Sequence, residues 1–401
     1  MIVYVPDNLL TGIEKYQDNS KVYKAIIQKR TYSKNGNSLK PYISIIIPCY
    51  NVEEYIDRCM KTVTSQTIGI DKLQVIAVND ASTDNTLDKL INWEKKYPEN
   101  IIVISYNKNL RQGGARNIGL CYADAEYIGF VDSDDWIELN MYEILYNIIS
   151  DKKLDTVKCK CIYDFATPEK FNLVDFIPSE APAEESLILY DFEKINGFYK
   201  EEIHDYGKEG RWGGVWSGIY LKERILKNNI WFPEKLIYED NFWGSVLSLY
   251  IKNTCIADKV LYHYFQRGNS AVHVRNDKSH FDRLSIEILI IEEYKKRGIF
   301  DVFHDYLEHR FIQMFYLNTL YTIFTKFDYI PDIFNFLKEK VFFFFPDIIN
   351  EIDVSCYNEL DQKLIKLLFV QGYVYPEMLI EIKNIFLQIV AAHIVNNENI
   401  Q

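Results

Sequence analysis

The sequence lacks the features that would mark a membrane, secreted or disordered protein. No run reaches the roughly 18 apolar residues that a membrane-spanning helix requires. The amino terminus has no basic segment followed by an apolar one, so we expect no signal peptide. No stretch has the composition of a disordered tract, since 48% of the residues are hydrophobic and 25% are charged. We therefore expect a globular cytoplasmic protein, with peripheral contact at the inner face of the cell membrane left open.

The chain also lacks an excess of basic residues. Its 57 Asp and Glu residues outnumber its 45 Lys and Arg residues, which gives a net charge of −12. Because nucleic-acid binding depends on releasing counterions to a basic surface, we expect no nucleic-acid partner. A phosphate ligand would have to be neutralised locally, by a metal ion and a few well-placed Arg or Lys side chains.

Cysteine is scarce and follows no recognisable framework. The seven cysteines are an odd number and are scattered along the chain, so they do not predict a set of disulfides. Cys159 and Cys161 lack the second Cys or His pair that a structural zinc site needs. We expect reduced thiols that are mostly packed in the interior.

The length and the hydrophobic patterns predict three parts in a chain of 401 residues. Residues 1–40 form a helical extension, residues 41–280 form an α/β domain, and residues 281–401 form a helical carboxyl-terminal domain. Residues 155–210 are expected to be irregular. The helical domain is indicated by apolar residues at helical spacing between Phe311 and Phe324. This domain could pack on the α/β domain, on another subunit or against a membrane.

Strand and helix patterns alternate between residues 43 and 149. Strands are expected at Ile43–Ile47, Leu73–Val78, Ile101–Ser105 and Tyr127–Val131, and helices at Glu53–Gln66, Thr86–Lys96, Gly113–Ala123 and Met141–Ile149. Alternation with short connections is typical of right-handed βαβ units. It predicts an α/β fold with an open, mostly parallel sheet that is flanked by helices.

Polar residues gather where these strands end. The segments Pro48–Asn51, Asn79–Asp84 and Asp132–Asp134 follow three strands, and Asn107 and Arg111 follow another. Helix caps and turns could explain each segment separately. In an open parallel sheet, however, ligands bind outside the carboxyl ends of the strands. The convergence of these segments on one edge favours a binding site there.

The pair Asp132 and Asp134 carries the most specific chemistry at this edge. Two carboxylates one residue apart offer hard oxygen ligands to a divalent cation, which would in turn hold a phosphate. Taken alone, the pair has a structural alternative, because Asp at a strand end often caps the following helix and keeps the turn hydrated.

Four segments together resemble the bacterial family-2 nucleotide-sugar glycosyltransferases, which have the GT-A fold. They are Ser44–Asn51, Val78–Asp84, Gly113–Gly119 and Phe130–Asp135. Each segment is short, but their order and spacing are specific. The family usually has Asp and Gly where this chain has Asn79 and Ala81, and the acid at Asp80 is kept.

The resemblance implies an inverting transfer of a sugar from a nucleotide diphosphate, most simply UDP. The acceptor would be a hydroxyl of a glycan or lipid-linked glycan, a precursor of capsule, lipopolysaccharide, teichoic acid or a glycoprotein glycan. The cofactor would be Mn²⁺ or Mg²⁺. Residues 41–150 would be the Rossmann-like half that binds the nucleotide sugar, and residues 151–280 the acceptor half.

The resemblance also implies roles for individual residues at the nucleotide sugar. The implied binding residues are Pro48, Tyr50, Asn51, Asp80, Arg116, Asp132, Ser133, Arg267 and Ser270. Asp80 would accept a hydrogen bond from uracil, and Arg267 would contact the diphosphate with Ser270. Arg116 would reach the base or the neighbouring acids, although a solvated or salt-bridged side chain is an equal alternative.

The resemblance places the metal and the proton chemistry on different segments. Asp134 would bind the metal directly, Asp132 would serve the ribose or a metal-bound water, and His263 is a candidate third ligand. Asp240 would be the general base with Glu239 as its neighbour. Both acids could instead simply begin a helix, where negative charge is favoured.

Other assignments stay open. A non-catalytic nucleotide-sugar or glycan-binding protein on the same fold is the main alternative. A sugar nucleotidyltransferase is disfavoured, since the segment Cys49–Glu54 after the first strand is acidic and has no glycine. Trp212, Trp216 and Trp243 could stack on sugar rings, but aromatic residues near an apolar strand are more often part of a core. The carboxyl-terminal helices could also form an oligomer contact.

Overall fold

The computed structural model describes residues 21, 23–24, 27, 40–164, 187–195, 198–200, 214–266, 274–348, 352 and 354–398. The chain divides into two compact units, one covering Lys15–Arg267 and the other containing Gly268–Gln401. We describe each unit by itself. The unit boundary lies near residue 268, whereas the predicted domain boundary lies at residue 280. The organisation into three domains stays a prediction, and the extension 1–40 lies almost wholly outside the described residues.

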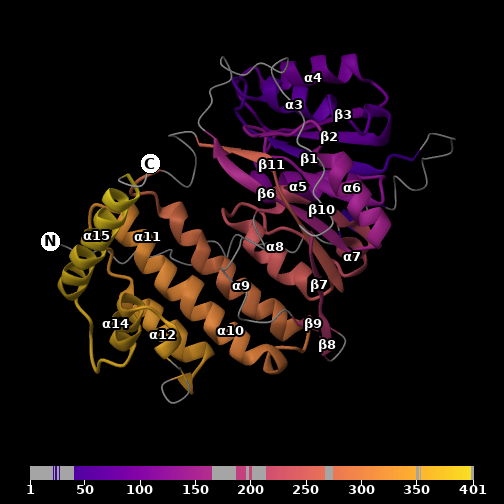
Figure 1. The fold of residues 1–401 in the computed structure, drawn as a ribbon. Coiled ribbons are helices and arrows are strands. Elements are labelled where there is room, and N and C mark those ends of the chain that lie inside the picture. Colours follow the sequence, from indigo (N-terminus) through magenta and orange to yellow (C-terminus); the bar gives the residue numbers. More distant parts are fainter. Residues whose placement is uncertain are drawn as a thin grey trace. The chain divides into compact units, whose positions relative to one another are not determined.

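The first unit is built on a mixed sheet with the strand order β3-β2-β1-β4-β10-β6-β11-β5, in which β7 pairs with β11 (Figure 1). Its first half consists of the parallel strands β1 (Ile43–Cys49), β2 (Leu73–Asp80), β3 (Ile101–Tyr106) and β4 (Tyr127–Phe130). Strands β1, β2 and β4 are buried along their whole length, as their continuous apolar sequences predict. The predicted α/β fold with a mostly parallel sheet is confirmed.

Helices cover both faces of this half of the sheet. They are α3 (Ile56–Thr64), α4 (Thr86–Lys96), α5 (Arg111–Tyr122) and α6 (Met141–Lys152), with a short turn η1 (Ile70–Lys72) before β2. Residues of α3, α4 and α6 share one core with Ile43, Ile45 and Ile47 of β1. Helix α5 lies on the opposite face, where Gly119 allows close approach: a Cβ at Gly119 would lie 2.4 Å from Cγ2 of Ile46.

The second half of the sheet is formed by segments that lie far along the sequence from the first strands, and β10 joins it to β4. Its strands are β5 (Trp136–Ile137), β6 (Thr156–Asp164), β7 (Leu187–Asp191), β10 (Gly218–Leu221) and β11 (Asn253–Phe265). The same part of the chain contains the short turn η6 (Val215–Ser217) and the helices α7 (Lys222–Lys227) and α8 (Glu239–Ser248). Strands β8 (Glu193–Ile195) and β9 (Phe198–Lys200) form a separate two-stranded sheet. Strand β10 runs antiparallel to both β4 and β6, and β11 runs parallel to β6. The regular strand β6 contradicts the expectation that residues 155–210 are irregular throughout.

The second unit is helical. Its elements are η7 (Lys278–Phe281), α9 (Asp282–Lys296), η8 (Asp301–Phe303), α10 (His304–Arg310), the π-helix η9 (Phe311–Leu317), α11 (Asn318–Lys326), α12 (Phe334–Phe344), η10 (Val354–Cys356), α14 (Glu359–Leu368) and α15 (Pro376–Glu398). Phe311 and Phe315 stack at 4.1 Å between ring centroids in its core. Buried Arg310 donates two hydrogen bonds of 2.9 Å to Glu287. Among the described residues, no helix is both long and apolar enough to cross a membrane.

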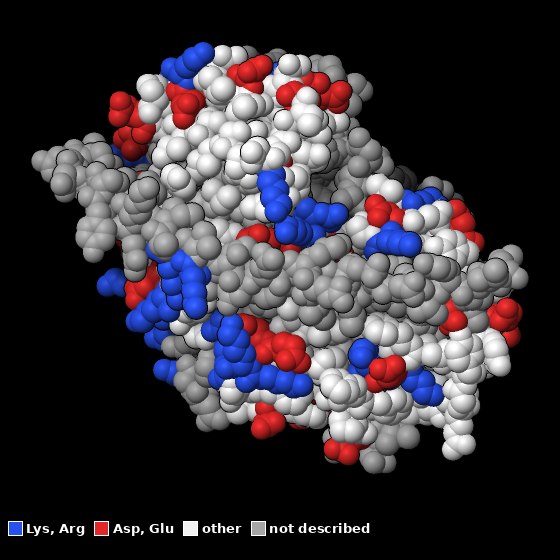
Figure 2. Space-filling model, turned by 180° about the vertical axis from the view of Figure 1, so that it is seen from behind, with Lys and Arg blue, Asp and Glu red and all other residues white. Residues whose placement is uncertain are grey.

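Surface charge is mixed where the structure describes it. On the face drawn in Figure 2, basic and acidic side chains of the described residues lie near one another. Several exposed ion pairs show the same mixing, such as Lys89 with Asp57 at 2.6 Å and Lys160 with Asp258 at 2.5 Å. Pairs of this kind contribute little to stability because water screens them.

Candidate active site

The first two strand ends are joined by a network centred on Asn51. Asn51 adopts a left-handed backbone conformation (φ 50°) at the turn after β1. Its backbone N–H donates to Ser82 Oγ at 3.1 Å, and its Oδ1 accepts from the Thr83 N–H at 2.8 Å. Pro48 is buried within β1, whereas Tyr50 is 48% exposed. The network therefore fixes the turn that presents the Tyr50 ring at the surface.

Asp80 lies at the end of β2 and is only 2% exposed. Its Oδ1 accepts a hydrogen bond of 2.7 Å from the backbone N–H of Leu110, in the turn before α5. Burial raises the pKa of the Asp80 carboxyl, and the backbone hydrogen bond opposes that rise. The carboxylate ties two loops at the ligand edge together, and its contact with a uracil ring stays a prediction.

The turn that carries Asp132 and Asp134 is anchored by the acid that follows it. Asp135 is fully buried, and its carboxylate accepts hydrogen bonds from the Tyr262 hydroxyl at 2.6 Å and the Phe265 N–H at 2.8 Å. Burial raises the pKa of Asp135 well above its ordinary value, and the charges of Asp134 and Asp132 add to the effect. The sequence motifs gave Asp135 no role of its own. Its position between the acidic pair and an apolar segment, Trp136–Ile137, was nevertheless a signal, because an acid in an apolar setting needs a hydrogen-bond partner.

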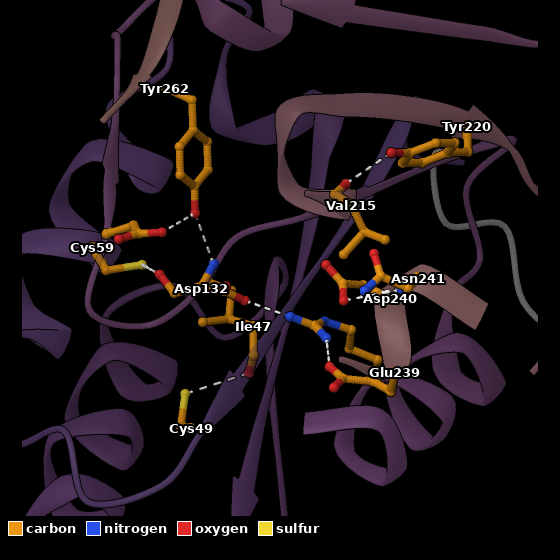
Figure 3. Close-up of polar contacts among 12 residues, drawn as sticks. Ile47, Cys49, Cys59, Asp132, Val215, Tyr220, Glu239, Asp240, Asn241 and Tyr262 are labelled. Carbon is orange, nitrogen blue, oxygen red and sulfur yellow. Dashed lines mark hydrogen bonds and ion pairs between the residues drawn. The ribbon is translucent and has the colours of Figure 1, made fainter. Parts of the chain in front are cut away.

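Two further contacts fix the same turn. The Tyr262 hydroxyl accepts a hydrogen bond of 3.1 Å from the backbone N–H of Asp132, as Figure 3 shows. Arg58 of α3 donates from Nη2 to the Asp134 carbonyl at 2.9 Å. Ser133 is buried, while the side chains of Asp132 and Asp134 are partly exposed. The backbone of the turn is thus held rigidly, while the side chains of Asp132 and Asp134 keep part of their surface accessible.

The other predicted acids begin α8. Tyr238 precedes the helix in a left-handed conformation (φ 68°), and Glu239 and Asp240 occupy the first turn. Asp240 Oδ1 accepts from the Asn241 N–H at 3.0 Å. Glu239 is buried and Asp240 is partly exposed. Glu239 and Asp240 therefore begin a helix, as the structural alternative to a catalytic role predicts. The helix also holds both side chains in fixed positions, which a catalytic role requires.

Arg116 of α5 joins the two groups of acids. Its Nη2 donates to Asp132 Oδ1 at 2.7 Å, its Nη1 forms an ion pair with Glu239 Oε1, and its guanidinium lies 5.5 Å from the centroid of the Phe232 ring. Arg116 is 2% exposed. It is not solvated but forms salt bridges with the neighbouring acids, an arrangement that both the implied role and the structural alternative allow. Its contact with a nucleotide stays a prediction.

The guanidinium of Arg116 pairs with Asp132 and Glu239, and the charge of Asp240 also acts on it. Figure 3 labels the three acids. Burial raises the pKa of Glu239 from 4.5 to about 7, although the charge of Arg116 opposes the shift. Burial raises the pKa of Asp240 as well, and Arg116 again opposes it. Burial lowers the pKa of Arg116, but Asp132 and Glu239 outweigh burial and raise it. With all groups ionised the cluster keeps an excess of negative charge, which favours binding a proton or a cation.

Metal binding can be tested against the ligands that the site offers. Within the described ranges, no group of three His, Cys, Asp or Glu side chains is placed to hold a metal ion. Mg²⁺ and Mn²⁺ that serve a diphosphate are commonly held by one or two carboxylates, with phosphate and water oxygens completing the shell. Asp132 and Asp134, in the turn after β4, fit that smaller requirement, with one oxygen of Asp132 also paired with Arg116.

His263 is engaged elsewhere. Its Nε2 lies 2.9 Å from Glu138 Oε1 and its Nδ1 lies 3.2 Å from Asp164 Oδ2. Its ring stacks on Trp136 with the centroids 3.4 Å apart. Both ring nitrogens therefore already have carboxylate partners, and a role as third metal ligand stays a prediction without support from this arrangement.

The remaining predicted residues divide into two groups. Arg267 and Ser270 lie outside the described residues, as does Trp212. Trp243 is 1% exposed and stacks on Phe232 at 4.8 Å, so it belongs to the core, as expected for at least one of the tryptophans.

Residues 44–211 match the family model described as Glycosyl transferase family 2. By this match, residues 44–211 belong to the family. The resemblance that the sequence motifs indicated is therefore confirmed, and the chain is a glycosyltransferase.

The chain is also similar to individual relatives and to a solved structure. The glycosyltransferase is 27% identical over 263 residues to "Uncharacterized glycosyltransferase YibD" of Escherichia coli, covering 65% of this chain and 72% of that protein. It is 41% identical over 114 residues to "Poly(ribitol-phosphate) beta-glucosyltransferase" of Bacillus spizizenii, covering 28% of this chain and 18% of that protein. The crystal structure of S. aureus TarS 1-349 matches with a TM-score of 0.47 and 23% identity, over 63% of this chain and 65% of that one. The matched part is thus less than two thirds of the last two proteins.

Proposed function

We propose that this glycosyltransferase is a metal-dependent, inverting enzyme that moves a sugar from a UDP-sugar to a hydroxyl of a cell-surface glycan precursor. One observation carries the proposal. Arg116 binds Asp132 of the acidic turn with one arm and Glu239 of α8 with the other. It thereby joins the predicted donor side of the site to the helix start that carries the predicted base, Asp240, although Glu239 lies 123 residues from Arg116 in sequence.

The nucleotide side of the proposal rests on the ends of β1 and β2. Uracil presents one ring N–H donor, so a carboxylate acceptor such as Asp80 distinguishes it from cytosine. The exposed ring of Tyr50 offers a face on which a base can stack, beside Pro48 and the turn at Asn51. These residues together would bind the uridine half of the donor.

The diphosphate would lie at the turn after β4. Asp134 and Asp132 would hold Mn²⁺ or Mg²⁺, which when bound offsets the negative charge that grows on the departing diphosphate. The buried anchors of Asp135 keep the turn in place while this charge develops. Ser133 lies between the two acids, and Arg267 and Ser270 would contact the phosphates from the segment after β11.

The proton chemistry falls to Asp240. An inverting transfer needs one carboxylate that removes the proton from the acceptor hydroxyl while its oxygen attacks opposite the leaving group. Asp240 is partly exposed, and burial raises its pKa, which strengthens it as a proton acceptor. Glu239 is buried and paired with Arg116, so its proposed role is to hold Arg116 rather than to take the proton.

The acceptor is proposed at the level of a class. One relative is named for transfer to poly(ribitol phosphate), which is a property of that protein. We extend to this chain only the class of cell-surface glycan or lipid-linked glycan precursors, with no nucleic-acid partner. Peripheral contact with a membrane from the cytoplasmic side, or an oligomer contact through the helical unit, would be compatible with such an acceptor.

Hydrolysis of the donor tests the proposal without knowledge of the acceptor. The full chain is incubated with a panel of UDP-, GDP- and dTDP-sugars, with manganese or with a chelator. We expect slow hydrolysis of at least one UDP-sugar that requires the metal and is lost in Asp134→Ala. Asp57→Asn, which removes an exposed carboxylate of α3, is the matched control and should hydrolyse the donor normally. Tight UDP binding without any turnover would favour the non-catalytic alternative instead.

A further inference from the structure

A row of aromatic side chains runs along β6 and β11, starting beside the acidic turn. Trp216 stacks on Tyr262 with ring centroids 4.3 Å apart and on Tyr264 at 5.5 Å, the second pair being almost parallel at 7°. Tyr264 meets Tyr163 edge to face at 5.8 Å. We call Trp216, Tyr264 and Tyr163 the aromatic shelf, with buried Tyr262 at its inner end.

The strand register explains why these rings share one face. In the parallel pair of β6 and β11, Tyr264 is the partner of Tyr163, and Tyr262 is the partner of Cys161. Residues two apart on a strand point to the same face, and register partners on neighbouring strands do so too. Tyr262, Tyr264 and Tyr163 therefore line one face of the sheet, and η6 places Trp216 against it.

Gly214 permits this position of Trp216. A Cβ at Gly214 would lie 2.1 Å from Nε1 of Trp216 and 2.3 Å from Cε2, so a larger residue would displace the indole. The sequence pattern Gly214-Val215-Trp216 thus has a local structural reason, because glycine leaves room for the ring beside the backbone of the preceding turn.

The shelf is continuous with the candidate active site. The Tyr262 hydroxyl at its inner end donates to Asp135 and accepts from the Asp132 N–H. Burial raises the pKa of Tyr264, and the charges of Asp132 and Asp135 raise it further, which places this ring close to the same acids. A ligand on the shelf would therefore reach the acidic turn.

The exposure of the rings increases from the inner end to the outer end. Tyr262 belongs to the hydrophobic core, Trp216 and Tyr264 pack against that core and are partly exposed, and Tyr163 is 66% exposed. In the part of the chain that the structure describes, the hydroxyls of Tyr163 and Tyr264 make no hydrogen bond with other residues. The shelf thus offers both apolar ring faces and unused polar groups.

We propose that the aromatic shelf binds sugar rings of the acceptor, so that the acceptor lies along β6 and β11 with its reacting hydroxyl toward Asp240. A pyranose ring has an apolar face of C–H groups and a rim of hydroxyls, which matches rings with polar edges. The row is longer than one ring, so the occupant is an oligosaccharide. This inference rests on the proposed function, since it names the acceptor subsite of that transfer.

Oligosaccharide binding to the full chain tests the shelf directly. The probes are cellohexaose, maltohexaose, chitohexaose and laminarihexaose at millimolar concentration, and binding is measured by calorimetry without donor. We expect at least one probe to bind. Tyr163→Ala should weaken that binding about 2- to 10-fold, on the basis of about 0.5–1.5 kcal/mol for an aromatic contact. Tyr163→Phe, which keeps the ring, should bind within about twofold of the unaltered chain if stacking carries the affinity.

A matched control separates the shelf from general effects of losing a tyrosine. Tyr42 precedes β1, is 37% exposed and stacks on Tyr146 at 4.6 Å, at the opposite end of the strands from the acids. Tyr42→Ala should bind the probe like the unaltered chain. The proposal is overturned if no probe binds the unaltered chain, or if Tyr163→Ala and Tyr42→Ala behave alike. Because the donor is absent from this assay, a failure of UDP-sugar hydrolysis would refute the proposed function while leaving the shelf as a glycan-binding site.

Discussion

The bridge formed by Arg116 makes a prediction that can be worked out from the structure. In Arg116→Met, an apolar side chain of similar length replaces the guanidinium. Asp132 and Glu239 then lose their shared cation, and Glu239 is left buried with no counter-charge from Arg116. Because a buried charge without a partner is costly, the variant should be strongly destabilised.

The magnitude follows from measurements on comparable buried pairs. Removing one partner of a buried ion pair typically costs about 3–5 kcal/mol. A change of 1 kcal/mol moves the melting temperature of a domain of this size by about 2–4 °C. The first unit of Arg116→Met should therefore melt about 6–20 °C below that of the unaltered protein in mildly alkaline buffer, where Glu239 is ionised, measured by calorimetry in the presence of a chelator.

The difference in melting temperature between Arg116→Met and the unaltered protein should grow as the pH rises. The folded-state pKa of Glu239 is raised from 4.5 to about 7. A raised pKa stabilises the fold below the ordinary value, and that contribution is lost as the pH rises through the raised value. Without Arg116 the pKa values of Glu239 and Asp240 rise further, because the charge of Arg116 is what lowers them in the unaltered protein. The difference in melting temperature between the variant and the unaltered protein should thus be small in mild acid and reach its largest value in mild alkali.

Two results would refute the reasoning. One is a melting temperature for Arg116→Met that matches the unaltered protein at every pH. The other is a loss of stability that does not change with pH, which would indicate lost packing on Phe232 rather than uncompensated charge. The matched control is Arg224→Met, because Arg224 is 34% exposed and its partner Asp155, at 2.9 Å, also accepts a hydrogen bond from the Lys252 N–H and so keeps a partner in the variant. It should show a smaller and less pH-dependent loss.

Three further predictions concern the site and the fold. Asp240→Asn should lower glycosyl transfer about 10²- to 10⁴-fold while UDP binding, measured by calorimetry, is unchanged, and a parallel loss of UDP binding would contradict the assignment as base. The pH–rate profile should lose activity as the pH falls through a pKa of Asp240 that lies above the ordinary 3.8, since the base must be ionised, and an acid limb at or below 3.8 would disprove the raised pKa. Gly119→Ala should lower the free energy of unfolding by about 1–3 kcal/mol, because its Cβ meets Ile46 at 2.4 Å, whereas Gly244→Ala in α8, with open space around it, should not destabilise the fold.

The parts of the fold that sequence predicted correctly are those with local signals. Strand β1 covers Ile43–Cys49 where Ile43–Ile47 was expected, because a continuous apolar run is recognisable without its neighbours. The strand-end rule also placed Asp80 and Asp132 at one edge, since that rule needs only the βα alternation. The roles implied for Arg267 and Ser270 stay predictions.

Strand β6 was missed for a physical reason. Its first residues are buried, but Lys160 and Tyr163 in its second half are exposed, so the sequence shows neither a continuous apolar run nor a clean alternation. The strand exists because it pairs with β11, which lies about a hundred residues later. Pairing between distant segments depends on the whole sheet and leaves little trace in a local pattern.

Sequence alone determined where the first parallel strands end, and hence the edge of the sheet at which the predicted site residues Asp80 and Asp132 lie. Periodicity and turn residues are properties of a few neighbouring positions, and they are readable in one dimension. Only the tertiary structure decided that Arg116 joins Asp132 to Glu239, that Asp135 anchors the acidic turn to β11, and that His263 already has partners. Ion pairs and hydrogen bonds form over a few ångströms in space, and residues separated by more than a hundred positions come within that range only when the sheet has assembled.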